Sequence, residues 1–258
     1  MELKKLKPFN NSCRHAVKLS KNQLTKSVRL VKTLSTGLHY KAGRNNSGRI
    51  TVRHKGGRLK KLFKDVDLNH NCHATSLVVS LFYDSSRSGL AALNFDLTSK
   101  FFYYSKATHN IFPGTLIKCS SSLTEFGLGS RVGLAGLPTG SLFHSLDIEG
   151  KTVYSKSAGT QCQLLQKKNL FYKIRLPSGK IITLLTSSFA TLGSVSNLSH
   201  NLVNGGRAGF SRLKGVRPSV RGIAMNPVDH PHGGRTNGGM NPVTPWGLPT
   251  RGHPTKRK

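Results

Sequence analysis

Hydrophobic positions follow strand-like patterns in the middle of the chain and follow no regular period at either end. Residues 74–83, ATSLVVSLFY, form an apolar run of strand length, and shorter apolar runs follow at 90–97 and 101–104. A Pro-Gly pair then predicts a turn before another short strand at 115–118. Short strands at this spacing are typical of a closed sheet, so we expect an OB-like barrel over residues 61–121.

A second small barrel is predicted over residues 122–195. Its clearest element is a hairpin at 171–185, in which FYKIRL and KIITLL flank a Pro-Ser-Gly turn. Apolar residues alternate with Lys and Arg in the first of these strands, which indicates one buried face and one basic face. Further strands are expected at 141–148 and 161–165. The pattern alone does not distinguish an OB-like barrel from an SH3-like barrel here.

Four aromatic residues in a row, Phe101 to Tyr104, leave two interpretations open. The rings could stack on nucleobases, or alternate rings could fill the barrel interior. We favour the second interpretation, because neighbouring residues of a strand face opposite sides of a sheet.

Charge is spread very unevenly along the 258 residues, which carry 40 Lys and Arg against 9 Asp and Glu, a net charge of +31. Residues 1–64 hold 18 basic residues and one acid, residues 196–258 hold ten and one, and residues 65–195 hold twelve and seven. Such an excess of one sign opposes folding by self-repulsion unless a large polyanion neutralises it. We therefore expect basic, irregular extensions at 1–60 and 196–258 that bind nucleic acid.

Residues 215–246 carry the most specific pattern in these extensions. Five prolines exclude a regular helix and an interior strand, and two Gly-Gly pairs permit close backbone approach. Arg217, Arg221 and Arg235 supply forked donors that suit phosphate. Folded nucleic acid would hold such an extended segment in shape, and a disordered basic tail is the alternative. Residues 43–57, GRNNSGRITVRHKGG, are interpreted in the same way as an RNA-threaded arm.

Catalytic and metal-binding motifs are mostly missing from the sequence. There is no Walker-type phosphate loop and no Gly-x-Ser-x-Gly motif, and GLGSRVG at 127–133 predicts a tight turn. The four cysteines lie far apart, which fits neither a disulfide framework nor a zinc module, and no apolar run reaches membrane-spanning length. His70, Cys72 and His73 are neighbours on a turn and are not expected to chelate one metal.

The segment Asp229-His230-Pro231-His232 is the one group that resembles a site. An imidazole beside a carboxylate could act as a general base, and the same side chains could bind a metal. Alternatively, the imidazoles donate to RNA phosphates or 2′-hydroxyl groups while Asp229 fixes the turn at Pro231. We favour the alternative, because the flanking prolines give a rigid extended shape in place of a pocket.

Several segments together resemble the ribosomal protein L-two family of the large subunit. The matching motifs are GRNNSGRIT (43–51), YDSSRS (83–88), SAGT (157–160), ATLG (190–193), GVRPSVRGIAMNPVDHPHGG (215–234) and NPVTPWG (241–247). The resemblance implies a mostly β fold, in which an OB-like barrel is followed by an SH3-like barrel between the two basic extensions.

The resemblance also implies a function. The chain would be a structural constituent of the large ribosomal subunit that binds rRNA near the peptidyl-transferase region and supports subunit assembly and association. Large-subunit rRNA, neighbouring ribosomal proteins and, at the subunit interface, small-subunit rRNA are the implied partners, with no membrane. No enzyme activity and no cofactor are implied, although Mg²⁺ held by rRNA could lie nearby. One alternative is an enzyme acting on RNA or acyl groups through Asp229, His230 and His232, and another is a DNA-compacting protein.

The resemblance also implies RNA-binding roles for individual residues. Family members bind RNA through the Arg of a Y-D-x-x-R-S turn, here Arg87, and through an Arg before S-A-G, where this chain has Lys156. Lysine keeps the charge but loses the bidentate fork. The glycine loop after His232 lacks an acid that members carry, so its path should differ. The residues predicted to bind RNA are Arg44, Arg49, Arg53, Arg58, Arg87, Lys156, Arg207, Arg212, Arg217, Arg221, His230, His232, Arg235 and Trp246.

Smaller features predict a location. The cysteine usage indicates a reducing compartment, and the N-terminal MELKKLKPFNN has neither an apolar signal core nor the character of a transit peptide. The RTNGG sequence at 235–239 resembles that of mitochondrial members of the family. We expect a mitochondrial protein encoded by the organelle, with a bacterium or a plastid as alternatives.

Overall fold

The computed structural model describes residues 3–22, 24–25, 31–68, 75–120, 127–148, 151–185, 187–234 and 240–252. These residues fall into two compact units. Unit 1 contains Met1–Tyr40 and Lys60–Phe210, and unit 2 contains Lys41–Leu59 and Ser211–Lys258. Unit 2 is therefore built from two segments that lie far apart in the sequence.

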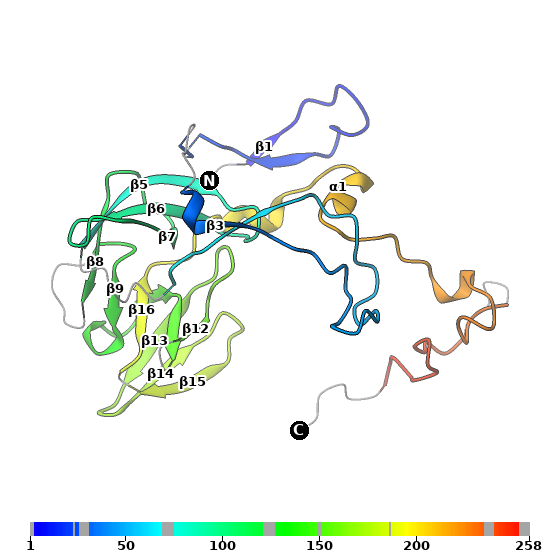
Figure 1. Ribbon diagram of the computed structural model, residues 1–258. Coiled ribbons are helices and arrows are strands. Elements are labelled where there is room, and N and C mark those ends of the chain that lie inside the picture. The colour runs from blue at the N-terminus through cyan, green and yellow to red at the C-terminus, as the bar shows by residue number, and fades with distance from the viewer. Residues whose placement is uncertain are drawn as a thin grey trace. The chain divides into compact units, whose positions relative to one another are not determined.

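A ten-stranded mixed sheet forms the centre of unit 1 (Figure 1). Its strands are β5 (Thr75–Tyr83), β6 (Leu90–Asp96), β7 (Phe102–Lys106), β8 (Leu116–Ser120), β9 (Arg131–Gly133), β10 (Leu142–His144), β13 (Cys162–Lys167), β14 (Phe171–Arg175), β15 (Ile181–Leu185) and β16 (Phe189–Leu192). They are ordered β15-β14-β13-β10-β16-β9-β8-β5-β6-β7. Neighbours are antiparallel except β8 and β9, which run parallel with Cys119 opposite Arg131. This parallel pair joins the strands of the first predicted barrel to those of the second.

Shorter elements complete the described residues. The two-stranded ladders pair β1 (Leu3–Lys5) with β2 (Val17–Leu19), β3 (Ser35–Gly37) with β4 (Leu62–Lys64), and β11 (Leu146–Ile148) with β12 (Lys151–Tyr154). Helical structure in the described ranges consists of α1 (Ala208–Leu213) and the 3-10 turns η1 (Lys32–Leu34), η2 (Leu134–Gly136), η3 (Leu198–Leu202) and η4 (Gly222–Ala224). The mostly β fold is confirmed and is consistent with an OB-like barrel followed by an SH3-like barrel. The four-part division of the chain at 60/61, 121/122 and 195/196 stays a prediction.

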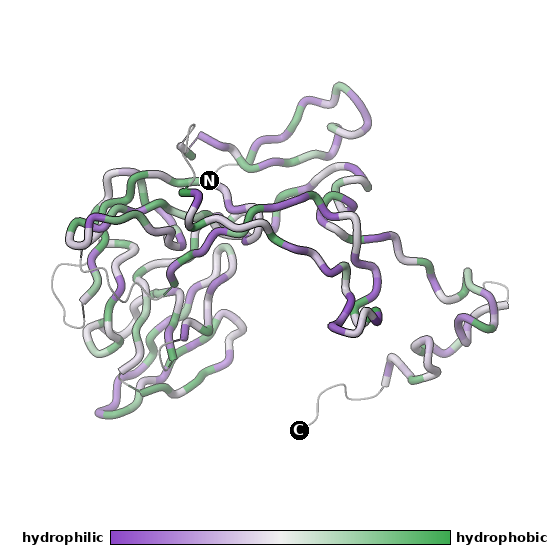
Figure 2. The backbone as a smooth tube through the Cα atoms, viewed as in Figure 1, coloured by the Kyte–Doolittle hydropathy of each residue, from purple (hydrophilic) through white to green (hydrophobic). Residues whose placement is uncertain are grey.

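Each half of the sheet has its own apolar core. Two buried clusters lie on opposite faces of β6, because one contains Ala91 and the other contains its neighbour Ala92. A third cluster fills the half formed by β9 to β16 and includes the fully buried Phe143 and Ile174. The matching hydrophobic stretches are visible along β5 and β6 (Figure 2). Burial of both faces explains why β6 begins with four consecutive apolar residues, Leu90 to Leu93, in the sequence.

The aromatic run at the start of β7 differs from the expected alternation. Phe102 is 45% exposed, whereas its neighbours Tyr103 and Tyr104 are 5% and 0% exposed. The Tyr103 hydroxyl donates to Ser76 Oγ at 2.9 Å, and the Tyr104 hydroxyl accepts from the Val31 N–H at 3.0 Å. Two adjacent tyrosines are buried because both faces of β7 are covered. The buried rings therefore belong to the core, where each hydroxyl has a partner.

A buried arginine fixes the connection between the halves. The segment 127–133 turns at Gly129, which has a φ of 87°, and then enters β9. Arg131 is 1% exposed, and its Nη2 pairs with Asp147 Oδ2 of β11 at 2.9 Å. Its Nη1 donates to the Leu68 carbonyl at 3.0 Å. Burial lowers the pKa of Arg131, and Asp147 opposes this shift. One guanidinium thus ties three segments of unit 1 together.

Removing one member of this pair should be costly. An Asp147→Ala substitution leaves the Arg131 charge buried without its counter-ion, so we expect it to lower the free energy of unfolding by about 3–5 kcal/mol. The matched control is the double variant Arg131→Met with Asp147→Leu, which removes both charges and should cost clearly less. Urea unfolding measures the free energy of unfolding of the single and the double variant. Equal stability of Asp147→Ala and the unsubstituted protein would contradict the assigned role of the pair.

Candidate nucleic-acid interface

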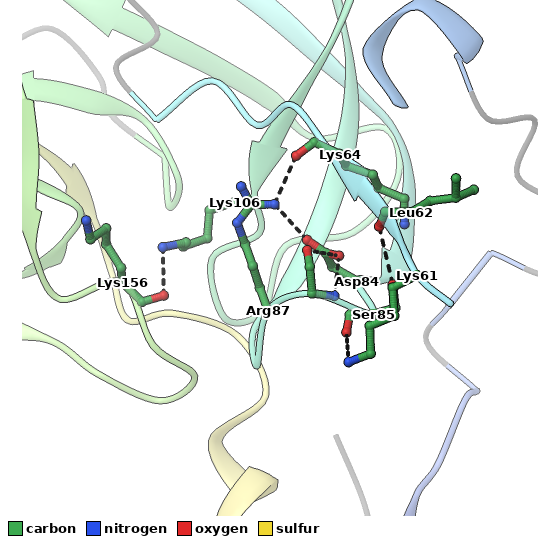
Figure 3. Close-up of polar contacts among 9 residues, drawn as sticks. Lys61, Leu62, Lys64, Asp84, Ser85, Arg87, Lys106 and Lys156 are labelled. Carbon is green, nitrogen blue, oxygen red and sulfur yellow. Dashed lines mark hydrogen bonds and ion pairs between the residues drawn. The ribbon is translucent and has the colours of Figure 1, made fainter. Parts of the chain in front are cut away.

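Arg87 is held in place by the turn between β5 and β6 (Figure 3). The buried Asp84 accepts at Oδ1 from the N–H and the hydroxyl of Ser86, at 2.9 and 2.8 Å. Its Oδ2 pairs with Arg87 Nη1 at 2.8 Å, and that nitrogen also donates to the Lys64 carbonyl at 3.1 Å. Burial opposes ionisation of Asp84, but the hydrogen bonds from Ser86 and Arg87 outweigh it and hold the pKa below its usual value. Arg87 is therefore anchored at Nη1 while its side chain stays 27% exposed.

Lys106 lies beside this arginine, and Lys156 lies on the other side of Lys106 (Figure 3). Lys106 ends β7, and its Nζ donates to the Lys156 carbonyl at 2.6 Å. Lys156 follows β12, and its own Nζ donates to the Thr152 carbonyl at 3.0 Å. We name Arg87, Lys106 and Lys156 the seam cluster. Its members come from three separate segments of unit 1.

Hydrogen bonds to Ser88 bring these segments together. The Ala158 N–H donates to Ser88 Oγ at 3.0 Å, and the side-chain amide of Asn197 donates to the Ser88 carbonyl at 2.8 Å. The YDSSRS and SAGT motifs are therefore in direct contact, although 70 residues separate Ser88 from Ala158. Asn197 is 1% exposed and has a φ of 67°, a left-handed conformation that Asn tolerates better than most residues. The seam cluster thus has a buried, hydrogen-bonded base.

The charge on Lys106 is unfavourable in the free protein. Burial, and then the nearby charges of Arg87 and Lys156, lower the pKa of Lys106 to about 7. An anion at this place would supply the missing counter-charge. Phosphate suits Arg and Lys side chains, because both make charge-assisted hydrogen bonds to its oxygens. The seam cluster is therefore our candidate phosphate-binding site.

Two further lysines support the turn itself. Lys61 Nζ donates to the Ser85 carbonyl at 2.6 Å. Lys64 is 7% exposed, and its Nζ lies 4.2 Å from the centroid of the Phe82 ring. Burial lowers the pKa of Lys64, while Asp84 opposes that shift and Arg87 adds to it. These two lysines hold the loop that presents Arg87.

The structure brings together two predicted residues, Arg87 and Lys156, and adds Lys106, which the sequence analysis missed. A single lysine at the end of a strand carries no signal of its own. The surroundings of Lys106 include Lys156, which is 50 residues away in the sequence.

Unit 2 joins its two segments through backbone hydrogen bonds. The Gly56 N–H donates to the Gly215 carbonyl at 2.9 Å, and the Arg217 N–H donates to the His54 carbonyl at 3.0 Å. Both glycines have positive φ values, of 153° and 87°. Parts of the two basic extensions, Lys41–Leu59 and Ser211–Lys258, therefore form unit 2, whereas the rest of both extensions belongs to unit 1.

Several predicted residues gather in this unit. Arg44, Arg53 and Arg217 line one cavity, and the Arg53 guanidinium carbon lies 5.1 Å from the ring centroid of Trp246. The other predicted residues are dispersed over exposed or half-buried positions. These are Arg49, Arg58, Arg207, Arg212 and Arg221. Arg235 lies outside the described residues, as do His70, Cys72 and His73.

His230 lies inside its own segment and is 8% exposed. Its Nδ1 accepts from the His232 N–H at 3.0 Å, and the two rings are 4.7 Å apart. A Cβ on Gly222 would come within 2.5 Å of the His230 ring, so the approach of these segments requires glycine. Because Nδ1 accepts, a neutral His230 carries its proton on Nε2. In this tautomer Nε2–H is a hydrogen-bond donor, and the ring has no free lone pair with which to act as a general base.

Two kinds of feature, groups of metal-ligating side chains and membrane-spanning helices, are absent from the described part of the chain. No group of three or more His, Cys, Asp or Glu side chains there could hold a metal ion. No helix among the described residues is long and apolar enough to cross a membrane.

The fold and the basic sites define the class of this protein. Unit 2 has six Lys and Arg in its first segment and nine in its second, against Asp229 as its single acid, and unit 1 carries the seam cluster on a β scaffold. These features define a nucleic-acid-binding β protein. Residues 31–119 match the family model "Ribosomal Proteins L2, RNA binding N-terminal domain", and residues 128–247 match "Ribosomal Proteins L2, C-terminal domain".

Similar proteins come from bacteria and from a mitochondrion. "Large ribosomal subunit protein uL2" of Wolbachia sp. subsp. Brugia malayi (strain TRS) is 39% identical over 263 residues, and "Large ribosomal subunit protein uL2m" of Reclinomonas americana is 39% identical over 267. Each alignment covers the whole of this chain and 95% of the relative. The chain therefore belongs to the ribosomal protein L2 family, whose members are RNA-binding structural proteins of the large subunit and not enzymes. The catalytic interpretation of Asp229, His230 and His232 is thus wrong.

Lys106 should make RNA binding depend on pH. Phosphate raises the pKa of the bound amine above the free value of about 7, so its contribution is fully present below that pH. The contribution is lost as pH rises through the pKa of the bound state. Affinity for large-subunit rRNA, measured between about pH 6 and pH 9, should fall more steeply for the unsubstituted protein than for Lys106→Met. Lys106→Arg, which stays charged, is the control and should lack the extra fall. A pH-independent ratio between the unsubstituted protein and Lys106→Met would refute this.

Gly222→Ala should displace the His230 ring. The added Cβ overlaps the imidazole, so the hydrogen bond from the His232 N–H should be lost. In the RNA-bound protein, we expect the His232 amide to exchange with solvent at least tenfold faster. Gly209→Ala is the matched control, because nothing lies within 4 Å of a Cβ at Gly209. If the His232 amide were equally protected in both variants, the close packing at Gly222 would be refuted.

Proposed function

We propose that this chain binds large-subunit rRNA through its phosphate groups and thereby stabilises the folded rRNA. The observation that carries the proposal is the seam cluster. There Arg87 is anchored by Asp84, and Lys106 donates to the Lys156 carbonyl at 2.6 Å while its charge lacks compensation. Such a site is more stable with an anion than without one.

The geometry suits a phosphate in particular. Arginine has five N–H donors, and the hydrogen bonds that the Arg87 guanidinium makes to Lys64 and Asp84 both use Nη1. The Nε and Nη2 donors can therefore serve a phosphate oxygen. Lys156 acts as a point charge where family members are expected to have a bidentate arginine, so Arg87 should set the orientation of the bound phosphate. Contacts to phosphates carry no base sequence, and specificity would come from the shape of the folded RNA.

The extensions at 1–60 and 196–258 would thread between rRNA helices, while the barrels at 61–121 and 122–195 rest on the rRNA surface. The high basic content of unit 2 and the family membership support this arrangement. The segment around His230 would lie near the peptidyl-transferase region, where its Nε2–H positions the extension by donating to RNA. Supporting subunit assembly and association, next to neighbouring ribosomal proteins and small-subunit rRNA, is part of the same proposal.

A mitochondrial location, with the gene in the organelle, is the location we propose. The RTNGG sequence at 235–239 supports a mitochondrial location, and so does the similarity to the uL2m of Reclinomonas americana. The similar Wolbachia proteins keep a bacterial source as the second candidate. Subcellular fractionation of the source cells, with the chain traced by mass spectrometry, decides between them.

The seam cluster can be tested through Arg87. We expect Arg87→Ala to weaken binding to large-subunit rRNA by about 1–3 kcal/mol, because a charge-assisted contact to phosphate is lost. Arg175→Ala is the matched control, since Arg175 is exposed on β14 of the same unit. Equal affinity of the two variants would place Arg87 outside the interface. Duplex DNA serves as competitor, and equally tight binding to it would favour a general DNA-binding protein instead.

A further inference from the structure

Unit 2 contains a cavity of about 600 Å³, for which the proposed function names no particular ligand. Its lining combines two kinds of side chain. Arg44, Arg53, Lys55 and Arg217 supply positive charge, and Ile50 and Val52 supply an apolar wall. Figure 2 shows short green stretches between purple ones along residues 41–59. The volume lies within the range of about 300–1,000 Å³ that is typical of sites for small molecules.

The apolar wall is presented by a short hydrogen-bonded loop. The N–H groups of Thr51 and Val52 both donate to the Gly43 carbonyl, at 2.9 and 3.1 Å. The Asn45 N–H donates to the Arg49 carbonyl at 2.9 Å, and the Arg49 N–H donates back to Asn45 Oδ1 at 3.0 Å. Gly43 has a φ of 74°, and a Cβ there would overlap the Val52 carbonyl. The loop therefore has a defined backbone without help from the barrels.

Ile50 and Val52 form the apolar part of the cavity lining and are exposed to solvent. They are 60% and 51% exposed in an otherwise strongly basic segment. Water-exposed branched residues at this place do not stabilise the free protein. They would be useful if a flat, apolar group covered them.

The arginine side chains that line the cavity are also partly held in place before any ligand binds. The Arg217 N–H donates to the His54 carbonyl at 3.0 Å, and the Arg217 side chain passes close to Gly56, where a Cβ would lie 3.2 Å from its Cδ. The Arg53 guanidinium lies over the Trp246 ring at 5.1 Å. This contact with the indole restrains the Arg53 side chain, and a guanidinium plane can also stack on the ring of a base.

An apolar wall, a stacking guanidinium and several cations together match a nucleotide. The base would lie against Ile50, Val52 and the Arg53 guanidinium, and its phosphate would lie among the remaining cations. A paired base cannot reach this wall, because it stays inside the helical stack, whereas an unpaired base can turn outward and stack on Arg. An acidic peptide would use the cations but not the flat apolar surface. We propose that this cavity holds one unstacked nucleotide of the bound RNA, an inference that rests on the proposed rRNA binding.

The experiment compares chemical reactivity of the RNA, nucleotide by nucleotide, in complexes with the full chain. The probes are dimethyl sulfate for unpaired bases and a 2′-hydroxyl acylating reagent for the backbone. The pocket variant carries Ile50→Ser and Val52→Ser, which are tolerable because both positions are exposed. The matched control carries Val220→Ser and Val228→Ser, since these residues of unit 2 are 56% and 90% exposed and do not line the cavity.

We expect one unpaired nucleotide to be protected by the unsubstituted protein and by the control variant. In the pocket variant its reactivity should rise to that of protein-free RNA, while the rest of the footprint is kept. Identical footprints for the pocket and control variants would overturn the inference. A general loss of protection in the pocket variant would also overturn it, because those residues would then support the fold and not one nucleotide. Failure of the unsubstituted protein to give any footprint would instead refute the proposed rRNA binding.

Discussion

The net charge of +31 is the constraint on which the rest of this structure depends. Nine acids cannot neutralise forty basic residues, and like charges repel one another in a compact chain. The buried acids serve internal purposes. Asp84 and Asp147 each pair with an arginine, and Asp96 accepts hydrogen bonds from the backbone of Thr98 and Ser99. These carboxylates fix turns and side chains, and they leave the surface cations to a polyanionic partner.

Contacts between the two barrel halves bring the cations of the seam cluster together. The parallel β8–β9 pair and the Arg131 pair connect the halves, and the hydrogen bonds to Ser88 align the loops that carry Arg87 and Lys156. Lys106 then lies between two cations at a place where burial already disfavours its charge. In the proposed complex a phosphate would supply the missing counter-charge, so RNA affinity and proton uptake by Lys106 would be coupled.

Sequence patterns predicted the elements that repeat a simple period. The apolar run of β5 and the alternating hairpin of β14 and β15 were both predicted, and in the hairpin Phe171 lies opposite Leu185. The parallel β8–β9 pairing and the contact between the arms in unit 2 left no periodic signal, because each depends on backbone contacts between distant segments. The candidate site divides in the same way. Motifs indicated Arg87 and Lys156, but Lys106 acquires its properties only from its three-dimensional neighbours.

The salt dependence of affinity for large-subunit rRNA tests most directly whether neutralised phosphates hold this protein on RNA. The logarithm of the association constant should fall linearly with the logarithm of salt concentration, with a slope of about −0.7 to −0.9 for each phosphate contacted. Because the chain carries many cations in the seam cluster and unit 2, a steep total slope is expected. An affinity that stayed constant between about 50 and 200 mM salt would contradict the electrostatic account.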